Sequence, residues 1–302
     1  MIRLYKYLTV CYVVFLSACY STEKENPNIF HYNESSGVAN LDPAFAKSQS
    51  VMWVAHQLYN TLVEVDNQLH IVPSIATRWE VSPDRKTYTF YLRNDVFFHN
   101  DDCFENGKGR RLTAQDVVYS FKRIVDQSTA SPGSWIFDSK IDSLEGFKAL
   151  DDTTFQLKLV IPYHPILGIL SMQYCSIVPE EAVKKYGSDF RRHAVGSGPF
   201  QFVAWEEGQA LLLKKNANYF EKDNDGTQLP YLDGVKISFY DSKATEFLLF
   251  RQGKLHFIND IDASFKDEVL TKRGALRTDW KNKINLQTHP YLNIEYLGML
   301  VD

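Results

Sequence analysis

The sequence predicts a mixed α/β fold, and three observations support that prediction. Short stretches that alternate apolar with polar residues, as half-buried strands do, lie between stretches whose apolar residues recur at helical spacing. Glycine, proline and acidic turn residues separate these stretches along the whole chain. Behind the N-terminal segment, a body of about 275 residues exceeds one ordinary hydrophobic core. We therefore expect mixed sheets distributed over two lobes.

Residues 1–18 have the pattern of a secretory targeting segment. Arg3 and Lys6 give a positive start, residues 8–16 form a short apolar run, and small residues precede Cys19. The apolar run is too short to cross a bilayer, which needs about 20 residues. Leu16-Ser17-Ala18-Cys19 resembles a bacterial lipobox, in which the cysteine is lipidated; the alternative is a plain signal peptide with an incidental cysteine. The polar stretch 19–27 is expected to be a tether.

The first half of the body is expected to contain two helices and several strands. Ser48 caps a predicted helix that runs to about Glu64, with Val51, Ala55, Leu58 and Leu62 on one face. Thr113 lies three residues before Asp116 and precedes an apolar stripe, which predicts a helix that starts with a capping box. The predicted strands cover residues 29–32, 86–93, 140–150 and 154–160, the last two as a hairpin.

The second half is expected to alternate in the same way. Pro179 opens a predicted helix that Gly187 ends, and Ser242 caps another that ends at Gly253. The predicted strands cover residues 200–205, 210–215, 235–240, 284–287 and 291–299. The sequence stops at Asp302 directly after the last of these strands, without a closing helix or turn, as an interrupted sequence would.

Composition excludes several classes of function. The net charge is −4 and no block of lysine or arginine is present, so nucleic acid is not an expected partner. His99, Asp101, Asp102 and Cys103 are adjacent in sequence without a second ligand pair at a familiar spacing, and no metal or cofactor is expected. Cys103 and Cys175 could pair in an oxidising compartment or stay free. No nucleophile–base pair stands out, so we do not expect an enzyme.

Motifs spread over residues 29–300 resemble the family 5 extracytoplasmic solute-binding proteins of ABC importers, the peptide- and nickel-binding group. Each motif alone is weak, and their order and spacing carry the resemblance. The motifs are Leu41-Asp42-Pro43, Leu58 to Val63, Pro73 to Ala76, Trp79 to Ser82, Val96 to His99, Thr113 to Ser120, Ile177 to Pro179, Gly196 to Phe200, Asn216 to Phe220 and Leu229 to Asp233.

The resemblance implies a multi-lobed, periplasmic-binding-protein-like fold with a hinged cleft. It divides the body into a first lobe in two parts, residues 28–60 and 190–302, with a smaller lobe inserted at 61–189. The family's further ligand-closing lobe is expected to be absent from this sequence. The implied function is peptide capture for ABC permease subunits by hinge closure. The protein is then expected to be a monomer at the periplasmic or outer cell surface, anchored by a lipid on Cys19.

The resemblance also indicates candidate ligand contacts. The segment after Leu41-Asp42-Pro43 resembles the stretch whose main chain pairs with ligand, which selects Lys47, Ser48 and Gln49. Asn33 and Glu34, at the end of the first strand, are second candidates. Gly133 stands where peptide binders place an aromatic residue, and Trp135 is a possible substitute.

Two other functions remain open from the sequence. One is binding of a different solute, such as a nickel chelate, haem or an oligosaccharide. The other is a sensory or structural lipoprotein that has the same fold without a transporter, because a fold does not determine a function.

Overall fold

The computed structural model describes residues 28–141, 144–288 and 298–299. Its first sheet joins β1, at the start of the described residues, to three strands from residues 200–238, in the order β1-β10-β9-β8. β1 (Ile29–Asn33) runs parallel to β10 (Gly234–Ser238), whereas β9 (Ala210–Lys215) is antiparallel to β10 and to β8 (Phe200–Glu206). The sheet is therefore mixed, and the four strands predicted at these positions are confirmed.

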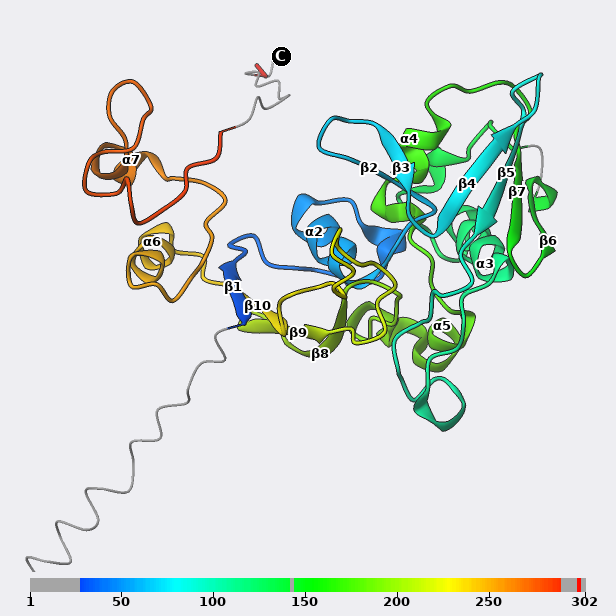
Figure 1. Ribbon diagram of the computed structural model, residues 1–302, viewed down its shortest axis with the longest axis horizontal. Helices are drawn as coiled ribbons and strands as arrows, with labels where there is room; N and C mark the ends of the chain where they lie inside the picture. The colour runs from blue at the N-terminus through cyan, green and yellow to red at the C-terminus, as the bar shows by residue number, and fades with distance from the viewer. Residues whose placement is uncertain (1–27, 142–143, 289–297, 300–302) are drawn as a thin grey trace, which may run out of the picture.

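A second sheet, entirely antiparallel, is built from the middle of the chain in the order β4-β5-β7-β6. Its strands are β4 (Ala76–Val81), β5 (Thr87–Leu92), β6 (Phe147–Asp151) and β7 (Thr154–Lys158). A short hairpin of β2 (Val63–Val65) and β3 (Ile71–Pro73) lies before it in sequence. Figure 1 shows this sheet at the opposite end of the molecule from α6 and α7.

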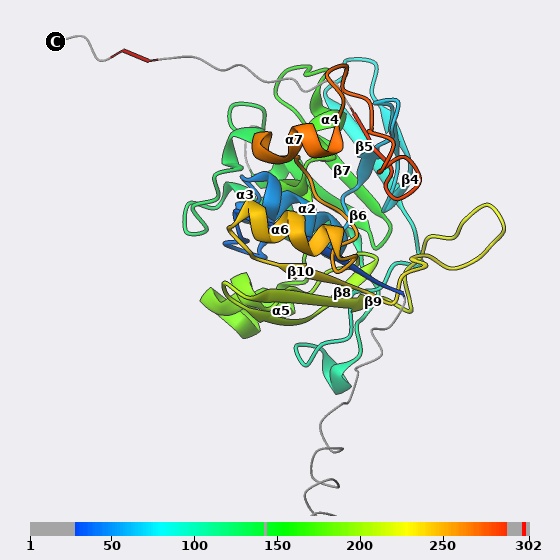
Figure 2. The ribbon, with the colours of Figure 1, turned by 90° about the vertical axis from the view of Figure 1, so that its left-hand side faces the viewer.

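The helices lie between and beside the sheets. They are α2 (Gln49–Leu58), α3 (Ala114–Val125), α4 (Ile166–Leu170), α5 (Glu180–Tyr186), α6 (Lys243–Arg251) and α7 (Ala263–Val269). Single 3₁₀ turns are η1 (Pro43–Phe45), η2 (Glu105–Gly107), η3 (Ser134–Ile136), η4 (Leu144–Gly146) and η5 (Gln173–Cys175), with a longer one, η6 (Gly187–Arg192). Figures 1 and 2 show α6 beside α7, where the Phe247 and Phe265 rings stack with centroids 4.5 Å apart.

Aromatic side chains fill the core of the second sheet. β5 alternates as predicted, so Tyr88, Phe90 and Leu92 are buried on one face. α3 covers this face and packs Phe121 against the rings of Phe137, Phe147 and Phe155, with centroids 5.2–5.7 Å apart. Edge-to-face contacts of this kind add to the burial of apolar area.

Several predicted helix ends are confirmed. The Asp116 carboxylate accepts the Thr113 N–H at 2.8 Å and the Thr113 hydroxyl at 3.1 Å, so the acidic side of the capping box is present. Gly187 follows α5 with φ of 51°, and Gly253 follows α6 with φ of 71°, a backbone region that favours glycine.

The helix predicted from Ser48 to Glu64 is too long, because it ends at Leu58. The carbonyls of residues 58, 60, 61 and 62 accept long-range hydrogen bonds from Gly198, Ile177, Ile75 and Ala76. Tertiary hydrogen bonds thus draw residues 59–62 out of the helix. The Ser48 hydroxyl also does not cap the helix and lies 3.2 Å from the Ser50 hydroxyl instead.

Four other expectations need correction or fall outside the described residues. Residues 284–287 are irregular, not a strand, and follow a turn in which the Ile284 N–H bonds to the Trp280 carbonyl. The strand predicted over 140–150 begins only at Phe147. Cys103 and Cys175 are both free thiols, so the possible disulfide is absent. The strand predicted over 291–299 falls almost wholly outside the described residues.

Candidate ligand-binding site

The segment Leu41 to Ala46 is almost fully buried and tightly hydrogen-bonded. The Asp42 carboxylate accepts the Ala44 N–H at 3.0 Å and so caps η1. The Leu41 carbonyl accepts the Tyr59 hydroxyl at 3.0 Å, and the Ala44 carbonyl accepts the Ser131 hydroxyl at 2.6 Å. One local hydrogen bond and two long-range ones therefore fix the main chain that precedes the predicted ligand contacts.

Lys47, Ser48 and Gln49 follow this anchored segment and are all exposed. They lie where the chain leaves η1 and enters the first turn of α2. The first N–H groups of a helix have no partner within it. The side chains of this short stretch are therefore accessible, whereas the Lys47 N–H donates to the Phe45 carbonyl at 2.7 Å. Ligand contact by Lys47, Ser48 and Gln49 stays a prediction.

Asn33 and Glu34 lie in different surroundings. Asn33 is buried, its Nδ2 donates to the Tyr240 carbonyl at 2.9 Å and to Glu246 at 3.0 Å, and its Oδ1 accepts the Tyr240 N–H at 2.8 Å. That side chain ties β1 to α6, a long-range role that the sequence did not reveal. Glu34 is half-buried and accepts the Ser36 hydroxyl at 2.6 Å. Ligand contact by either residue stays a prediction.

Trp135 is 47% exposed on η3, and its carbonyl accepts the Lys140 ammonium at 2.9 Å. The hydrogen bond between Ser131 and Ala44 brings its loop beside the anchored segment. Gly133 has a steric explanation: a Cβ there would lie 2.5 Å from Cδ1 of the Tyr174 ring. Tyr174, which comes from another part of the chain, thus occupies the space beside Gly133. No local signal in the sequence points to this residue.

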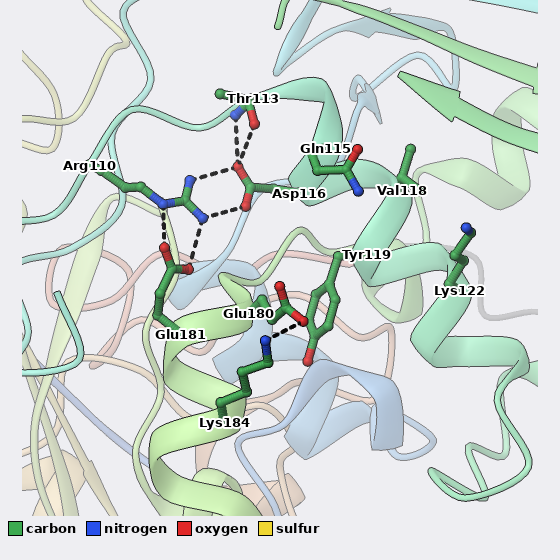
Figure 3. Close-up of a pocket in the computed structure, with 10 residues that line it drawn as sticks. All are labelled: Arg110, Thr113, Gln115, Asp116, Val118, Tyr119, Lys122, Glu180, Glu181 and Lys184. Atoms are coloured by element: carbon green, nitrogen blue, oxygen red, sulfur yellow. Dashed lines mark hydrogen bonds and ion pairs between the residues drawn. The ribbon is translucent and has the colours of Figure 1, made fainter. Parts of the chain in front are cut away.

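The described residues form two cavities of note, and neither is lined by Lys47, Ser48 or Gln49. One of about 430 Å³ lies beyond the end of α3 and includes Ser131 and Ser134. The other, of about 390 Å³, lies between α3 and α5. Figure 3 shows Arg110 in this second cavity, between Asp116 of α3 and Glu181 of α5. Arg110 donates to both carboxylates at 2.6–2.8 Å, which gives it a structural role between the helices.

His99 follows β5 in sequence, is buried, and bonds to the Gly196–Gly198 segment that precedes β8. Its Nδ1 accepts the Gly196 N–H at 3.3 Å, and its Nε2 donates to the Gly198 carbonyl at 2.9 Å. Burial lowers the pKa of His99 to about 4, so the imidazole is neutral. Next to it, Ser197 donates to Asn60 at 3.1 Å, and Asn216 donates to the Gly198 carbonyl at 2.9 Å. Buried hydrogen bonds thus join the segments that follow α2 and β5 to the segment that precedes β8.

His99 does not belong to a group of potential metal ligands among the described residues. Within the described ranges, no group of three or more His, Cys, Asp or Glu side chains is arranged to hold a metal ion. Burial and the neighbouring Asp101 raise the pKa of the Cys103 thiol, which disfavours the nucleophilic thiolate. In the same ranges, no helix is both long and apolar enough to cross a membrane.

The mixed α/β fold, with one sheet of β1 and β8 to β10 and a second sheet between them in sequence, is the fold of the periplasmic binding proteins. Residues 70–301 match the family model described as bacterial extracellular solute-binding proteins, family 5 Middle. The chain belongs to this family.

Individual relatives agree with that assignment. The periplasmic oligopeptide-binding protein OppA of Salmonella typhimurium is 28% identical over 279 residues, which are 87% of this chain and 47% of OppA. A dipeptide-binding protein of Lactococcus lactis is 30% identical over 88% of this chain and 50% of its own length. The chain thus spans about half the length of the curated relatives it matches.

Solved structures give the same fold. The Helicobacter pylori binding protein DppA in complex with the peptide STSA superposes with a TM-score of 0.70 and 26% identity over 80% of this chain and 48% of that chain. AgaA of A. tumefaciens R10, in complex with agropinic acid, also has a TM-score of 0.70 and 26% identity, over 80% and 45% of the two chains. These relatives are described as binding proteins and not as enzymes.

Proposed function

We propose that this protein is the solute-binding component of an ABC importer and that its solute is a peptide. The supporting observation is the similarity to peptide- and dipeptide-binding proteins along 80–88% of the chain. The local geometry agrees, because an exposed stretch at 47–49 follows a segment that is firmly anchored. An extended peptide carries an amide at every residue, so main-chain pairing gives affinity with little dependence on sequence.

The proposed contacts have separate roles. Main-chain groups of Lys47, Ser48 and Gln49 pair with the peptide backbone, and the Lys47 ammonium favours a nearby peptide carboxylate. Glu34 and the main chain of Asn33 are further proposed contacts, and Trp135 offers an aromatic face to a side chain of the peptide. Lobes joined by hinges then shut around the ligand, and permease subunits recognise the shut form.

We further propose that the protein is an extracytoplasmic monomer anchored by a lipid on Cys19. The support is the pattern of residues 1–19, together with relatives that are described as periplasmic. A thioether-linked lipid would hold the protein at a membrane surface, with residues 19–27 as the tether.

A second candidate solute follows from one of the structural relatives. AgaA was solved with agropinic acid and is as similar to this chain as DppA is. Agropinic acid is therefore the alternative ligand for this chain.

The test is to isolate the protein, as its own cells make it, in mild detergent and to identify small molecules released on denaturation by mass spectrometry. Co-purified peptides of mixed sequence are expected. A single non-peptide solute in stoichiometric amount would instead favour the alternative. The mass of the N-terminal fragment reports on Cys19 in the same experiment. If Cys19 is lipidated, the fragment lacks residues 1–18 and carries the added mass of a diacylglycerol.

A further inference from the structure

An ion pair connects the anchored segment to the inserted lobe. Arg123, in the last turn of α3, donates from Nη1 to Asp42 Oδ1 at 2.8 Å and from Nη2 to Asp42 Oδ2 at 2.5 Å. The Arg123 and Asp42 side chains are 14% and 5% exposed. Among the described residues, no other ion pair has both of its side chains buried to this degree. A buried, bidentate pair of this kind fixes orientation as well as distance.

Asp42 transmits that constraint to the main chain that follows it. Its Oδ1 accepts the Ala44 N–H as well as Arg123, so the guanidinium and the η1 turn share one carboxylate. The backbone N–H of Asp42 donates to Asn40 at 2.8 Å, which fixes the approach to the turn. Only two residues separate Ala44 from Lys47, the first of the predicted ligand contacts.

The guanidinium itself has little freedom. Its carbon lies 5.6 Å from the centre of the Phe190 ring, over the ring face. Phe190 is buried, and the neighbouring Arg191 carbonyl accepts the Leu41 N–H at 2.8 Å. Parts of the chain from residues 41–44, 123 and 190–191 therefore meet at one point, where the Arg123 guanidinium pairs with Asp42.

We infer that Arg123 is a positioning residue for the ligand segment Lys47 to Gln49 and acts on it through Asp42. The identity of the ligand rests on the proposed function. The positioning of residues 43–49 by Arg123 does not depend on it. It gives the inserted lobe, which supplies α3, a part in shaping the peptide site on the other lobe. Without the two parallel hydrogen bonds from Arg123 to Asp42, which form a fork, residues 43–49 should become more mobile. The core of the second sheet should not change.

The test uses Arg123→Lys, which keeps the charge but not the fork, and Asp42→Asn, which keeps the shape but not the charge. The first readout is hydrogen exchange of residues 43–50, measured by mass spectrometry on the full protein without ligand. The second is calorimetric affinity for the peptide Ser-Thr-Ser-Ala. Exchange in residues 43–50 should quicken about tenfold, and affinity should fall about tenfold, in both variants. Exchange in β5 and β7 should stay as in the wild type.

Arg111→Lys is the matched control, because Arg111 pairs with Asp152 at the surface, with side chains 38% and 75% exposed. It should leave both readouts unchanged. Wild-type exchange at 43–50 in both Arg123→Lys and Asp42→Asn would overturn the inference, and so would faster exchange spread equally over β5 and β7. If the wild type binds no peptide, the proposed function fails while the exchange readout still decides the role of Arg123.

Discussion

Gly196 and Gly198 allow two parts of the chain to approach within backbone contact. A Cβ at position 196 would lie 2.1 Å from the Leu58 carbonyl oxygen, and one at 198 would lie 2.5 Å from the Leu58 carbonyl carbon. The Gly198 N–H also donates to the Leu58 carbonyl at 3.0 Å. These glycines are needed for close approach, not for an unusual backbone angle.

Gly198→Ala is therefore expected to destabilise the fold by about 1–3 kcal/mol, since the added methyl group must displace backbone. Chemical denaturation measures the loss. Gly168→Ala is the control: position 168 lies in α4, with only the Ile71 Cδ1 within 4 Å of a new Cβ. That variant should be neutral or slightly more stable, because alanine favours a helix. Equal losses in both variants would contradict the packing explanation.

His99 predicts an acid dependence of stability. Its pKa in the fold is about 4, below the ordinary 6.5, so folding favours the neutral imidazole. The stabilisation is complete above pH 6.5 and declines as the pH falls towards 4, by up to about 3 kcal/mol. Urea unfolding at pH 7 and pH 5 should show this loss in the wild type and a smaller one in His99→Gln. His70→Gln, at a side chain 75% exposed, should keep the wild-type difference.

At the scale of elements, α3 is the helix on which both the core and the site depend. One face buries Phe121 in the aromatic core, its first turn contains the capping box, and its last turn provides Arg123. Its contacts with β6 and β7 hold it on the second sheet.

Phe121→Ala should destabilise the protein by about 3–5 kcal/mol, because it leaves a cavity among three rings. Thermal unfolding followed by circular dichroism reports the change. Leu150→Ala on β6, at a side chain 55% exposed, should stay within about 0.5 kcal/mol of wild type. A small effect at Phe121 would mean that α3 is not the centre of this core.

Local patterns in the sequence predict the elements well where local chemistry decides. The alternation in β5, the capping box at Thr113 and the glycine after α5 are all confirmed. The end of α2 is not predictable in this way, because hydrogen bonds from residues 75, 76, 177 and 198 decide it. The pairing of Asn33 with Glu246 and the packing of Tyr174 on Gly133 are likewise contacts between distant residues, and only the fold reveals them.

At the scale of the whole molecule, buried hydrogen bonds connect the regions that we expect to form two lobes, residues 28–60 with 190–302 and residues 61–189. His99 bonds to Gly196 and Gly198, and the Arg123–Asp42 ion pair forms a second connection. We expect these two lobes to move as one body. Closure over a ligand should then come from the further ligand-closing lobe that the family resemblance implies.

Localisation provides another prediction at this scale. Cys19→Ser should abolish lipidation, so the protein should move from the membrane fraction to the soluble extracytoplasmic fraction after cell fractionation. Cys11→Ser, within the same targeting segment, should leave the protein in the membrane fraction. Recovery of the wild-type protein in the soluble extracytoplasmic fraction would contradict the lipid anchor and favour a plain signal peptide.

The most direct test of the central claim is a calorimetric titration of the protein, as its cells make it, with Ser-Thr-Ser-Ala and with agropinic acid. The account predicts saturable one-to-one binding of the peptide, with a dissociation constant in the micromolar range or tighter, corresponding to at least about 8 kcal/mol. Binding of agropinic acid without binding of this or any other short peptide would contradict it.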